Sequence, residues 1–428
     1  MRFHQFRQSI SSARHALARW LTPLAPATAG ATSARRPAGP AALRDIRIED
    51  LLGRRQVDLD LGRIHDRLHG RTVLITGAGG SVGSELARQV ARFGPATLLL
   101  FDRSENDLFW IDTELRQMAP AVRSIAIAGD ILDNDRLREV FSTYRPHAVF
   151  HAAAYKHVPL MEINCFQAVV NNVFGTCNVA SMAQTAGVAD FVFISSDKAV
   201  KPTNVMGVTK RVAELIILAL RPGPTRFVSV RFGNVLGSAG SVVPLFAQQI
   251  AARRPVTVTH PDAMRYFMTV GEAVQLVLQA STMGDGGDVF MLDMGEPLKI
   301  VDLAHRLIRL YGLEPNRDVD VEFTGLRPGE KLLEELRFDS EGFRPTDHDK
   351  IQVLQGPAPE ANDIGRWLVT LQDAVDSKSV FRLVSVLKQI VPEYTPSPEL
   401  LARCETIPFD RRRRSPRTHG ALALRLDS

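Results

Sequence analysis

The stretch TVLITGAGGSVGSE, residues 72–85, decides the fold of this chain. It opens with a short apolar run rich in β-branched residues, which is typical of a buried parallel strand. A glycine-rich turn and a helical segment follow at once, with glycines at every third position: Gly77, Gly80 and Gly83. Between a strand and a helix, such glycines make the turn, let the backbone approach a pyrophosphate and allow close helix–strand packing.

The helix that begins at this turn carries Ser81 and Val82 at its start. The N-terminus of a helix holds an anion with its free backbone N–H groups. The stretch therefore predicts a dinucleotide-binding site, and a merely tight turn is the alternative.

Apolar runs continue to alternate with helical segments along the chain. They cover residues 97–101, 124–129, 148–153, 191–195 and 227–232. This rhythm predicts an α/β protein with a Rossmann-like, doubly wound parallel sheet. After residue 233 the rhythm loosens, which indicates a smaller C-terminal lobe that binds the substrate.

The chain is expected to divide into six parts. The boundaries are a disordered basic leader (1–44), a linking region (45–70), an NAD(P)-binding domain (71–233), a substrate-binding lobe (234–355), a helical extension with two helices (356–410) and a basic tail (411–428).

The 428 residues carry a net charge of +5, but this charge is unevenly placed. Residues 1–44 contribute +7 and residues 411–428 contribute +5, which leaves −7 for the part between them. A nucleic-acid-binding domain would carry the positive charge on its folded part, so that class is not favoured. The alternative for the basic ends is contact with an anionic membrane surface.

Three widely spaced cysteines suggest neither a disulfide framework nor a zinc site, and no metal is expected. No apolar run reaches the length of a membrane span. We therefore expect a cytoplasmic protein without a transmembrane segment, or one peripheral to the inner membrane.

Residues at the ends of the predicted strands are candidates for contact with the dinucleotide. Asp102 ends the second strand and would accept from both ribose hydroxyls, which favours NAD. Arg103 follows it and would suit the additional phosphate of NADP, so both cofactors stay open. Further along, Asp130 and Ile131 would face the adenine. The small residues Ala152, Ala153 and Ala154 would let the nicotinamide half pass, or would serve only helix–strand packing.

The fifth strand ends in Ser195, Ser196, Asp197 and Lys198. Ligands in such sheets bind outside the carboxyl ends of the strands, so this acid and amine would face the nicotinamide. A carboxyl group with a raised pKa can donate a proton, and a desolvated lysine with a lowered pKa can accept one. A surface Asp–Lys pair is the alternative.

The segment SSDKAVKPTNVMGVTK ends in a spacing that nicotinamide-dependent sugar enzymes commonly fill with Tyr-x-x-x-Lys. The lysine is present as Lys210, but the tyrosine position holds Met206. A thioether neither takes nor gives a proton. We interpret Met206 as a shape-filling residue beside the nicotinamide, with the chemistry carried by its neighbours.

Six stretches together resemble a known family: TGAGGSVGSELARQ, HAAAYKHVPLME, SSDKAVKPTNVMGVTKR, RFGNVLGSAGSVVPLF, MRYFMT and TGLRPGEKLLEEL. They are similar to the bacterial nucleotide-sugar 4,6-dehydratases of polysaccharide biosynthesis, a CapD-like branch of the extended short-chain dehydrogenases/reductases. The resemblance covers residues 45–355 and implies UDP-N-acetylglucosamine as substrate and a 4-keto-6-deoxy sugar as product, with inversion at C5 left open. It also implies a tightly bound NAD that is regenerated in each turnover, and a homo-oligomer.

The resemblance implies a role for each residue of the reacting stretch. Lys198 matches the base at C5, and Asp197 matches the acid that protonates the departing C6 hydroxyl. Ser196 stands where the family usually has threonine and would bond near O4. Lys210 would hold the nicotinamide ribose and favour the O4 alkoxide.

Substrate-binding candidates lie in the other matching stretches. Asn234 matches a residue that contacts the diphosphate in the superfamily, and Arg265 and Arg327 suit a phosphate or a structural ion pair. Lys156 and His157 would lie near the sugar, although His157 could equally be a packed loop residue. Glu330 and Lys331 could cap a following helix. The competing functions are a 4-epimerase, which needs no acid–base pair at C5 and C6, and a non-catalytic NAD-binding sensor.

Overall fold

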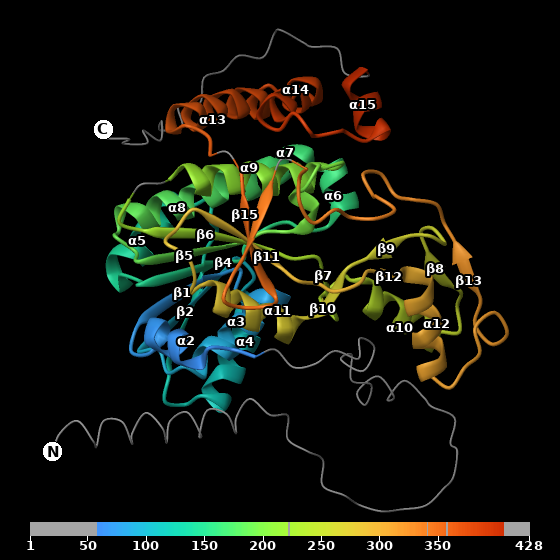
Figure 1. Ribbon diagram of the computed structural model, residues 1–428, viewed down its shortest axis with the longest axis horizontal. Helices are drawn as coiled ribbons and strands as arrows, with labels where there is room; N and C mark the ends of the chain where they lie inside the picture. Colours follow the sequence, from blue (N-terminus) through green and yellow to red (C-terminus); the bar gives the residue numbers. More distant parts are fainter. Residues whose placement is uncertain (1–57, 221–222, 340, 357, 406–428) are drawn as a thin grey trace, which may run out of the picture.

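The computed structural model describes residues 58–405, except 221–222, 340 and 357. A central sheet carries helices on both faces, a smaller lobe extends from one side, and the C-terminal helices cover one helical layer (Figure 1). The predicted basic leader and basic tail lie outside the described residues.

The predicted doubly wound sheet is confirmed. Six strands pair in parallel in the order β3-β2-β1-β4-β5-β6. Buried side chains fill β5 completely, as expected for a parallel strand covered on both faces. The strands are β1 (Thr72–Thr76), β2 (Thr97–Asp102), β3 (Arg123–Ala128), β4 (Ala148–His151), β5 (Asp190–Ile194) and β6 (Arg226–Arg231).

Alternating side chains divide the core into two layers, because successive residues of a strand point to opposite faces. In β1, Val73 and Ile75 join one cluster, whereas Leu74 joins the other. The first face is covered by α2 (Leu61–Leu68), α3 (Ser81–Ala91), α4 (Glu105–Met118) and α11 (Val270–Ala280). The second face is covered by α5 (Asn134–Tyr144), α8 (Gly175–Thr185) and α9 (Val205–Ala219).

The sheet continues beyond residue 233, the predicted end of the nucleotide-binding domain. Strand β11 (Asp288–Leu292) pairs in parallel with β6, and β15 (Ile351–Gln355) and β14 (Gly342–Pro345) extend it antiparallel. The second part of the chain therefore supplies one edge of the central sheet as well as the smaller lobe. The division at residue 233 stays a prediction, and the sheet itself crosses it.

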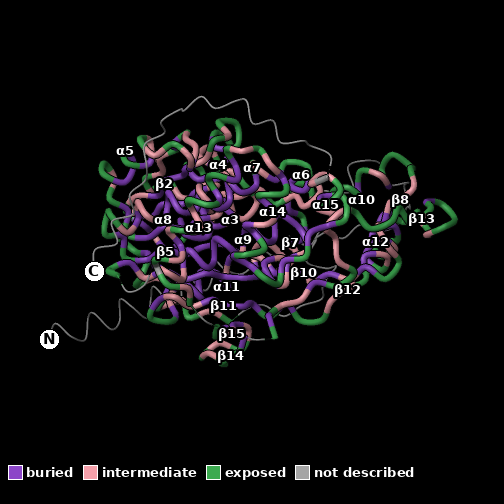
Figure 2. The backbone as a smooth tube through the Cα atoms, turned by 90° about the horizontal axis from the view of Figure 1, so that it is seen from above, coloured by how far each residue is buried: buried purple, intermediate pink, exposed green. Residues whose placement is uncertain are grey.

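The smaller lobe is built from short strand pairs and two helices around its own core. Its helices are α10 (Val242–Ala251) and α12 (Ile300–Leu310). Its pairs join β7 (Asn234–Leu236) with β10 (Phe267–Thr269), β9 (Met264–Arg265) with β12 (Leu298–Lys299), and β8 (Val256–Val258) with β13 (Val321–Phe323). Seen from above, this lobe stands to one side of the buried sheet (Figure 2).

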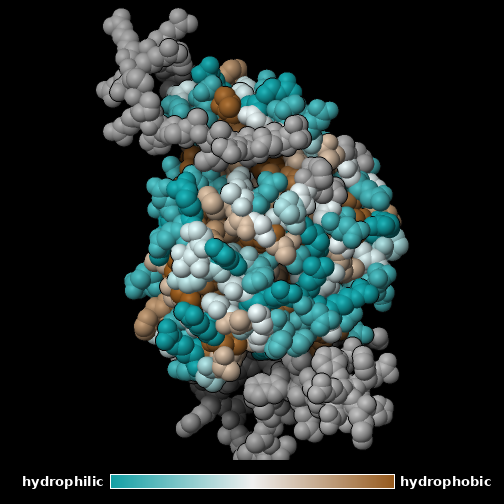
Figure 3. All heavy atoms as spheres, turned by 90° about the vertical axis from the view of Figure 1, so that its left-hand side faces the viewer, coloured by the Kyte–Doolittle hydropathy of each residue, from teal (hydrophilic) through white to brown (hydrophobic). Residues whose placement is uncertain are grey.

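Both helices expected in the C-terminal extension are present, as α13 (Ala361–Asp376) and α14 (Val380–Ile390). A third, α15 (Pro398–Glu405), was not predicted. Their apolar sides pack on α9 and on α7 (Cys165–Val169) in one buried cluster. Within the described ranges, no helix is both long and apolar enough to cross a membrane. The side of the molecule opposite the smaller lobe is largely hydrophilic, with scattered apolar residues (Figure 3).

Candidate functional site

A cleft of about 860 Å³ runs from the glycine-rich turn along the carboxyl ends of the parallel strands to the smaller lobe. It brings together almost every residue that the sequence predicted for the site; Asp197 alone is not on its wall. The predicted residues on the wall are Gly77, Gly80, Ser81, Val82, Gly83, Asp102, Arg103, Asp130, Ile131, Ala152, Ala153, Ala154, Lys156, His157, Ser196, Lys198, Met206, Lys210, Asn234, Arg265 and Arg327.

The glycine-rich turn has no room for larger side chains. Gly77 has a φ of +70°, and a Cβ there would lie 2.7 Å from the backbone nitrogen of Ala153. A Cβ on Gly83 would lie 2.0 Å from the carbonyl oxygen of Gly77. The N-cap residue of α3 is Gly80, which has no side chain to cap the helix. The backbone N–H groups at the N-terminus of the helix are therefore open to an anion. These features fit a dinucleotide pyrophosphate.

Asp102 and Arg103 end β2 in different situations. The carboxylate of Asp102 accepts from the backbone N–H groups of Gly79, at 2.9 Å, and Ser104, at 3.0 Å. These bonds fix the carboxylate against the glycine-rich turn. Arg103 donates to the hydroxyl of Tyr155, and its guanidinium lies 4.6 Å from the centre of that ring. Arg103 is therefore engaged across the cleft, by a partner that the sequence analysis did not single out.

Lys210 is buried and lines the cleft beside the end of β5. Its Nζ donates to the carbonyl oxygen of Ile194 at 2.5 Å and lies 4.0 Å from the ring centre of Phe193. Burial lowers the pKa of Lys210 to about 7, although the charge of Glu214 raises it. Glu214 offsets only part of the effect of burial on Lys210, because its negative charge is shared with the arginines that are bonded to it.

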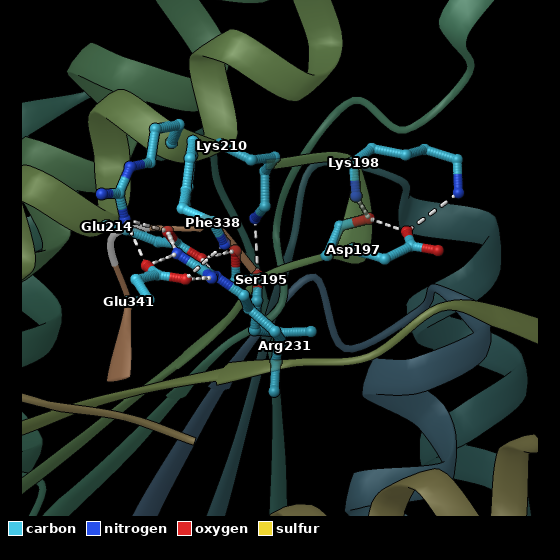
Figure 4. Close-up of polar contacts among 11 residues, drawn as sticks. Ser195, Asp197, Lys198, Lys210, Glu214, Arg231, Phe338 and Glu341 are labelled. Carbon is cyan, nitrogen blue, oxygen red and sulfur yellow. Dashed lines mark hydrogen bonds and ion pairs between the residues drawn. The ribbon is translucent and has the colours of Figure 1, made fainter. Parts of the chain in front are cut away.

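That carboxylate belongs to a buried ionic cluster that the sequence analysis missed (Figure 4). Arg231, whose side chain is 0% exposed, makes paired hydrogen bonds with Glu214 (2.7 and 2.7 Å) and Glu341 (2.8 and 2.9 Å). Ser195 donates to Glu214 at 2.6 Å. Burial raises the pKa of Glu214, but Arg231 outweighs it and brings that pKa to about 2. The cluster ties β6 and α9 to the segment before β14.

Asp197 and Lys198 form a second polar group, in a short 3-10 turn after β5 (Figure 4). Lys198 Nζ donates to Asp197 Oδ1 at 3.0 Å and to Asn234 Oδ1 at 2.8 Å. Ser196 caps this turn and donates to Asp197 Oδ1 at 2.9 Å. The Asp197 side chain is 0% exposed, and its Oδ2 has no hydrogen-bond partner within the described part of the chain. The alternative of a surface pair is therefore excluded.

The predicted lowering of the Lys198 pKa is wrong. Burial does lower it, but the negative charges of Asp197 and Glu334 outweigh burial, so the pKa of Lys198 is raised. The prediction counted the burial of the amine and overlooked the second carboxyl group, which lies more than a hundred residues further along the chain.

The predicted phosphate-binding arginines both contact Glu330. Arg265 Nη2 lies 2.9 Å from Glu330 Oε1, and Arg327 Nε lies 3.3 Å from Glu330 Oε2. Both arginines still line the cleft, so their contact with phosphate stays a prediction. No helix follows Glu330 in the described residues up to 339, so the capping interpretation of Glu330 and Lys331 is wrong.

Met206 and His157 also lie on the wall of the cleft. Met206 is 4% exposed and packs in the cluster that α7, α9 and the C-terminal helices share. The ring of His157 lies against Gly240, where an added Cβ would come within 2.5 Å of its Cε1. His157 is therefore packed against the neighbouring loop, as one of its two interpretations expects. Its contact with a sugar stays a prediction.

A one-turn π-helix, η3 (Val170–Phe174), supplies a further part of the site that was not predicted. Its Asn172 accepts from the backbone nitrogen of Tyr155 at 2.8 Å and donates to the carbonyl oxygen of Tyr155 at 3.0 Å. Such π-turns often occur at functional sites. The signal that would have revealed it is the pair of adjacent asparagines, Asn171 and Asn172, within an apolar helix.

Curated relatives match about two thirds of the chain. The chain is 52% identical over 297 residues to "Capsular polysaccharide biosynthesis protein CapD" of Staphylococcus aureus. The aligned part covers 69% of the chain and 49% of that protein. It is 33% identical over 275 residues to a "UDP-glucose 4-epimerase" of Rickettsia rickettsii, covering 62% of the chain and 77% of that protein. The chain thus spans about half the length of the first of these relatives.

Solved structures with the same fold include "Pen from Bacillus thuringiensis", with a TM-score of 0.61 and 35% identity over 68% of the chain and 88% of that structure. The structure of "DesIV (dTDP-glucose 4,6-dehydratase) from Streptomyces venezuelae with NAD and TYD bound" has a TM-score of 0.54 and 21% identity, covering 62% and 88% of the two chains. The second likeness shows the fold alone.

Residues 73–356 match the family described as "Polysaccharide biosynthesis protein". This span contains the glycine-rich turn, the Asp197–Lys198 pair, Lys210 and the whole smaller lobe. The chain therefore belongs to the polysaccharide biosynthesis protein family, and it has the fold that nucleotide-sugar dehydratases and epimerases share.

Proposed function

We propose that the protein is an NAD-dependent nucleotide-sugar 4,6-dehydratase that converts UDP-N-acetylglucosamine into a UDP-4-keto-6-deoxy sugar for glycan synthesis. One observation carries this proposal: the Asp197–Lys198 pair is buried beside Asn234, and Lys198 faces the cleft that holds Lys210 further along its wall. An acid and an amine side by side have a use when two protons must move at neighbouring carbons.

NAD fits the cofactor end of the cleft better than NADP. Asp102 lies against the glycine-rich turn, where its negative charge disfavours an added 2′-phosphate. Arg103, the group that would suit this phosphate, is bonded to Tyr155. When bound, NAD would take a hydride from C4 of the sugar and return it to C6.

The chain's own residues would then carry the proton transfers. Lys198, in its neutral form, would accept the proton from C5. The electron pair of the broken C5–H bond would form a C5–C6 double bond as the C6 hydroxyl leaves with a proton from Asp197. Ser196 lines the cleft and donates to Asp197, so it connects this buried carboxyl group with the bound sugar.

Lys210 would serve the first oxidation. The proton of the O4 hydroxyl would pass to Ser196 or to a water. The ammonium form of Lys210 would favour the alkoxide that develops at O4, because a preorganised charge in a dry site stabilises the transition state. Burial leaves the pKa of Lys210 at about 7, so both its charged and neutral forms are accessible near neutral pH. Met206 would only fill space beside the nicotinamide.

A 4-epimerase is the second candidate, since a curated relative with 33% identity carries that name. An epimerase oxidises C4, rotates the ketosugar and reduces it again, so it has no use for a base at C5. The Asp197–Lys198 pair argues against it. A non-catalytic sensor would need neither this pair nor Lys210.

Incubation of the purified protein with NAD and UDP-N-acetylglucosamine, followed by mass spectrometry, tests the proposal. We expect the loss of one water from the nucleotide sugar, and NMR of the product would then give the configuration at C5. An unchanged mass with a changed sugar would establish the epimerase instead, and an unchanged sugar would favour the sensor. Parallel reactions with other UDP-hexoses would define the substrate. The cytoplasmic location and the homo-oligomer stay predictions.

A further inference from the structure

A buried carboxyl group other than that of Asp197 has no assigned role. It is Glu334, which lines the end of the cleft next to the smaller lobe, called here the sugar end. Glu334 is 3% exposed and lies on the same wall as Lys198, Asn234 and Arg265. No local pattern distinguishes Glu334 from the other acids of the stretch GEKLLEEL. Its position, its lack of partners and its charged surroundings together point to a function.

The backbone around Glu334 is held between the two halves of the site. Leu332 accepts from the backbone nitrogen of Met264 at 2.7 Å and from Arg265 Nη1 at 3.0 Å. On the other side, Lys331 Nζ donates to the carbonyl oxygen of Val200 at 3.2 Å, just after the turn that carries Lys198. Glu334 therefore stands between β9 and the Asp197–Lys198 turn.

The neighbouring acids of this segment are paired, whereas Glu334 is not. Glu330 contacts Arg265 and Arg327, and Glu335 contacts Lys201 and Lys331. Within the described residues, no hydrogen bond or ion pair reaches the carboxyl group of Glu334. A buried carboxylate without a partner is costly, so such a group is kept where its charge has a use.

The charges that face Glu334 come from three directions. Burial raises the pKa of Glu334; Lys198 lowers it, Asp197 raises it, and Arg265 and Lys331 lower it, with a raised pKa as the result. Burial lowers the pKa of Lys198, and so does the charge of Arg265. The charges of Asp197 and Glu334 raise it and outweigh both. Glu334 and Lys198 thus influence each other without a direct ion pair.

We propose that Glu334 is a positioning residue for proton transfer, and that its carboxyl group stabilises the ammonium form that Lys198 takes once it has accepted a proton from the sugar. The inference rests on the proposed role of Lys198 as the base at C5. In that step the C5–H bond breaks, a bond from nitrogen to hydrogen forms, and Lys198 gains one positive charge. A carboxylate fixed nearby favours this charge and so makes Lys198 the stronger base.

A labelling experiment tests the electrostatic part without any turnover. Only a neutral amine reacts with acetic anhydride, so below its pKa a lysine is labelled faster when that pKa is lowered. At pH 8, we expect Lys198 to be labelled on the order of tenfold faster in Glu334→Gln than in wild type, measured by peptide mass spectrometry relative to the exposed Lys388. The matched control, Glu335→Gln, should leave Lys198 unchanged. Equal labelling of Lys198 in both variants would overturn the proposal.

The pH dependence of water loss tests the catalytic part. Glu334→Gln should move the acidic limb of kcat/KM to lower pH and lower the plateau, because Lys198 becomes a weaker base. Glu334→Asp keeps the charge and should restore the position of the limb. A purely structural residue would lower the rate without moving the limb, which would contradict the proposal.

The two experiments also separate this inference from the proposed function. Faster labelling in Glu334→Gln, together with a wild-type protein that removes no water from the sugar, would uphold the effect of Glu334 on Lys198 and reject the dehydratase. Unchanged labelling, together with normal water loss by the wild type, would reject the inference and leave the dehydratase in place.

Discussion

The two ends of the cleft are built in different ways. At the cofactor end, backbone groups of one continuous segment, residues 76–85, form the cradle, and small residues keep it open. At the other end, next to the smaller lobe, where we propose that the sugar binds, side chains meet from the turn after β5, from β7, from β9 and from the segment near residue 334. The two lysines of the reacting stretch, Lys198 and Lys210, lie twelve positions apart in the sequence, and both line the cleft.

The difference is also electrostatic. Lys210 is surrounded by a carbonyl oxygen and an aromatic ring, and burial lowers its pKa to about 7. Lys198 is also largely enclosed, with 16% of its side chain exposed, but two carboxyl groups face it and its pKa is raised. Burial of an amine therefore decides nothing by itself, because the charges buried with it set the direction of the shift.

Lys198→Met breaks the sugar end and should have the largest effect. Loss of a positioned base costs on the order of a hundredfold to ten-thousandfold in turnover. We expect the rate of water loss to fall by that factor and the exchange of the C5 hydrogen for deuterium to stop. Normal turnover by this variant would reject Lys198 as the base.

Asp197→Asn removes the acid and keeps the shape of the side chain. Turnover should fall in the same range, on the order of a hundredfold or more. Exchange at C5 should persist while water is retained, since Lys198 can still take the proton. If C5 exchange and dehydration both stopped in this variant, Asp197 would serve only to hold Lys198.

Lys210→Met tests the lowered pKa at the cofactor end through stability. Between pH 7 and 10.5 the unfolded chain binds a proton at Lys210 that the folded chain lacks, so the free energy of unfolding of the wild type rises with pH in this window. The slope approaches about 1.4 kcal/mol per pH unit, and the variant lacks it. Urea unfolding from pH 7 to 10 should therefore show the wild type gaining stability relative to Lys210→Met. The exposed Lys388→Met should show no such relative change.

Asp102→Ala concerns the cofactor end alone. Without the carboxylate, NAD loses an acceptor for its ribose hydroxyls, whereas the 2′-phosphate of NADP is no longer repelled by a negative charge. The dissociation constant of NAD divided by that of NADP, both measured by calorimetry, should rise by about tenfold. An unchanged ratio would show that another group selects the cofactor.

Met206→Leu should have the smallest effect, because leucine fills a similar volume on the cleft wall. We expect turnover to change by less than about tenfold, well below the loss for an acid or base. If this variant were as damaging as Lys198→Met, the thioether would have a role that neither end of the cleft explains.

Sequence patterns predicted the shape of the glycine-rich turn well, because that shape depends on local backbone geometry. Glycines three residues apart, after an apolar run, have few other uses, and Gly77 and Gly83 indeed leave no room for a Cβ. The parallel sheet followed from the same periodicity. The order of strands beyond β6 did not follow, since β11 and β15 pair with partners far away in the sequence.

The sugar end was predicted only in part, for a physical reason. A strand end predicts where Asp197 and Lys198 lie, but their protonation depends on which distant charges the fold brings near. Nothing local distinguishes Glu334 from Glu335. Yet Glu334 is buried and has no partner among the described residues, whereas Glu335 forms surface ion pairs. The cluster around Arg231 was missed likewise, because its carboxylates come from residues 214 and 341.

The path of the chain through the sheet has a consequence for synthesis on the ribosome. Strand β6 is made well before β11, its neighbour in the finished sheet, so a nascent chain that has folded only as far as β6 carries an open strand edge. Such an edge can pair with other chains and promote aggregation. The segment that covers it follows β10, and the residues near 334 emerge later still. A growing chain therefore closes its exposed edge and completes its cleft in the same late stage of translation.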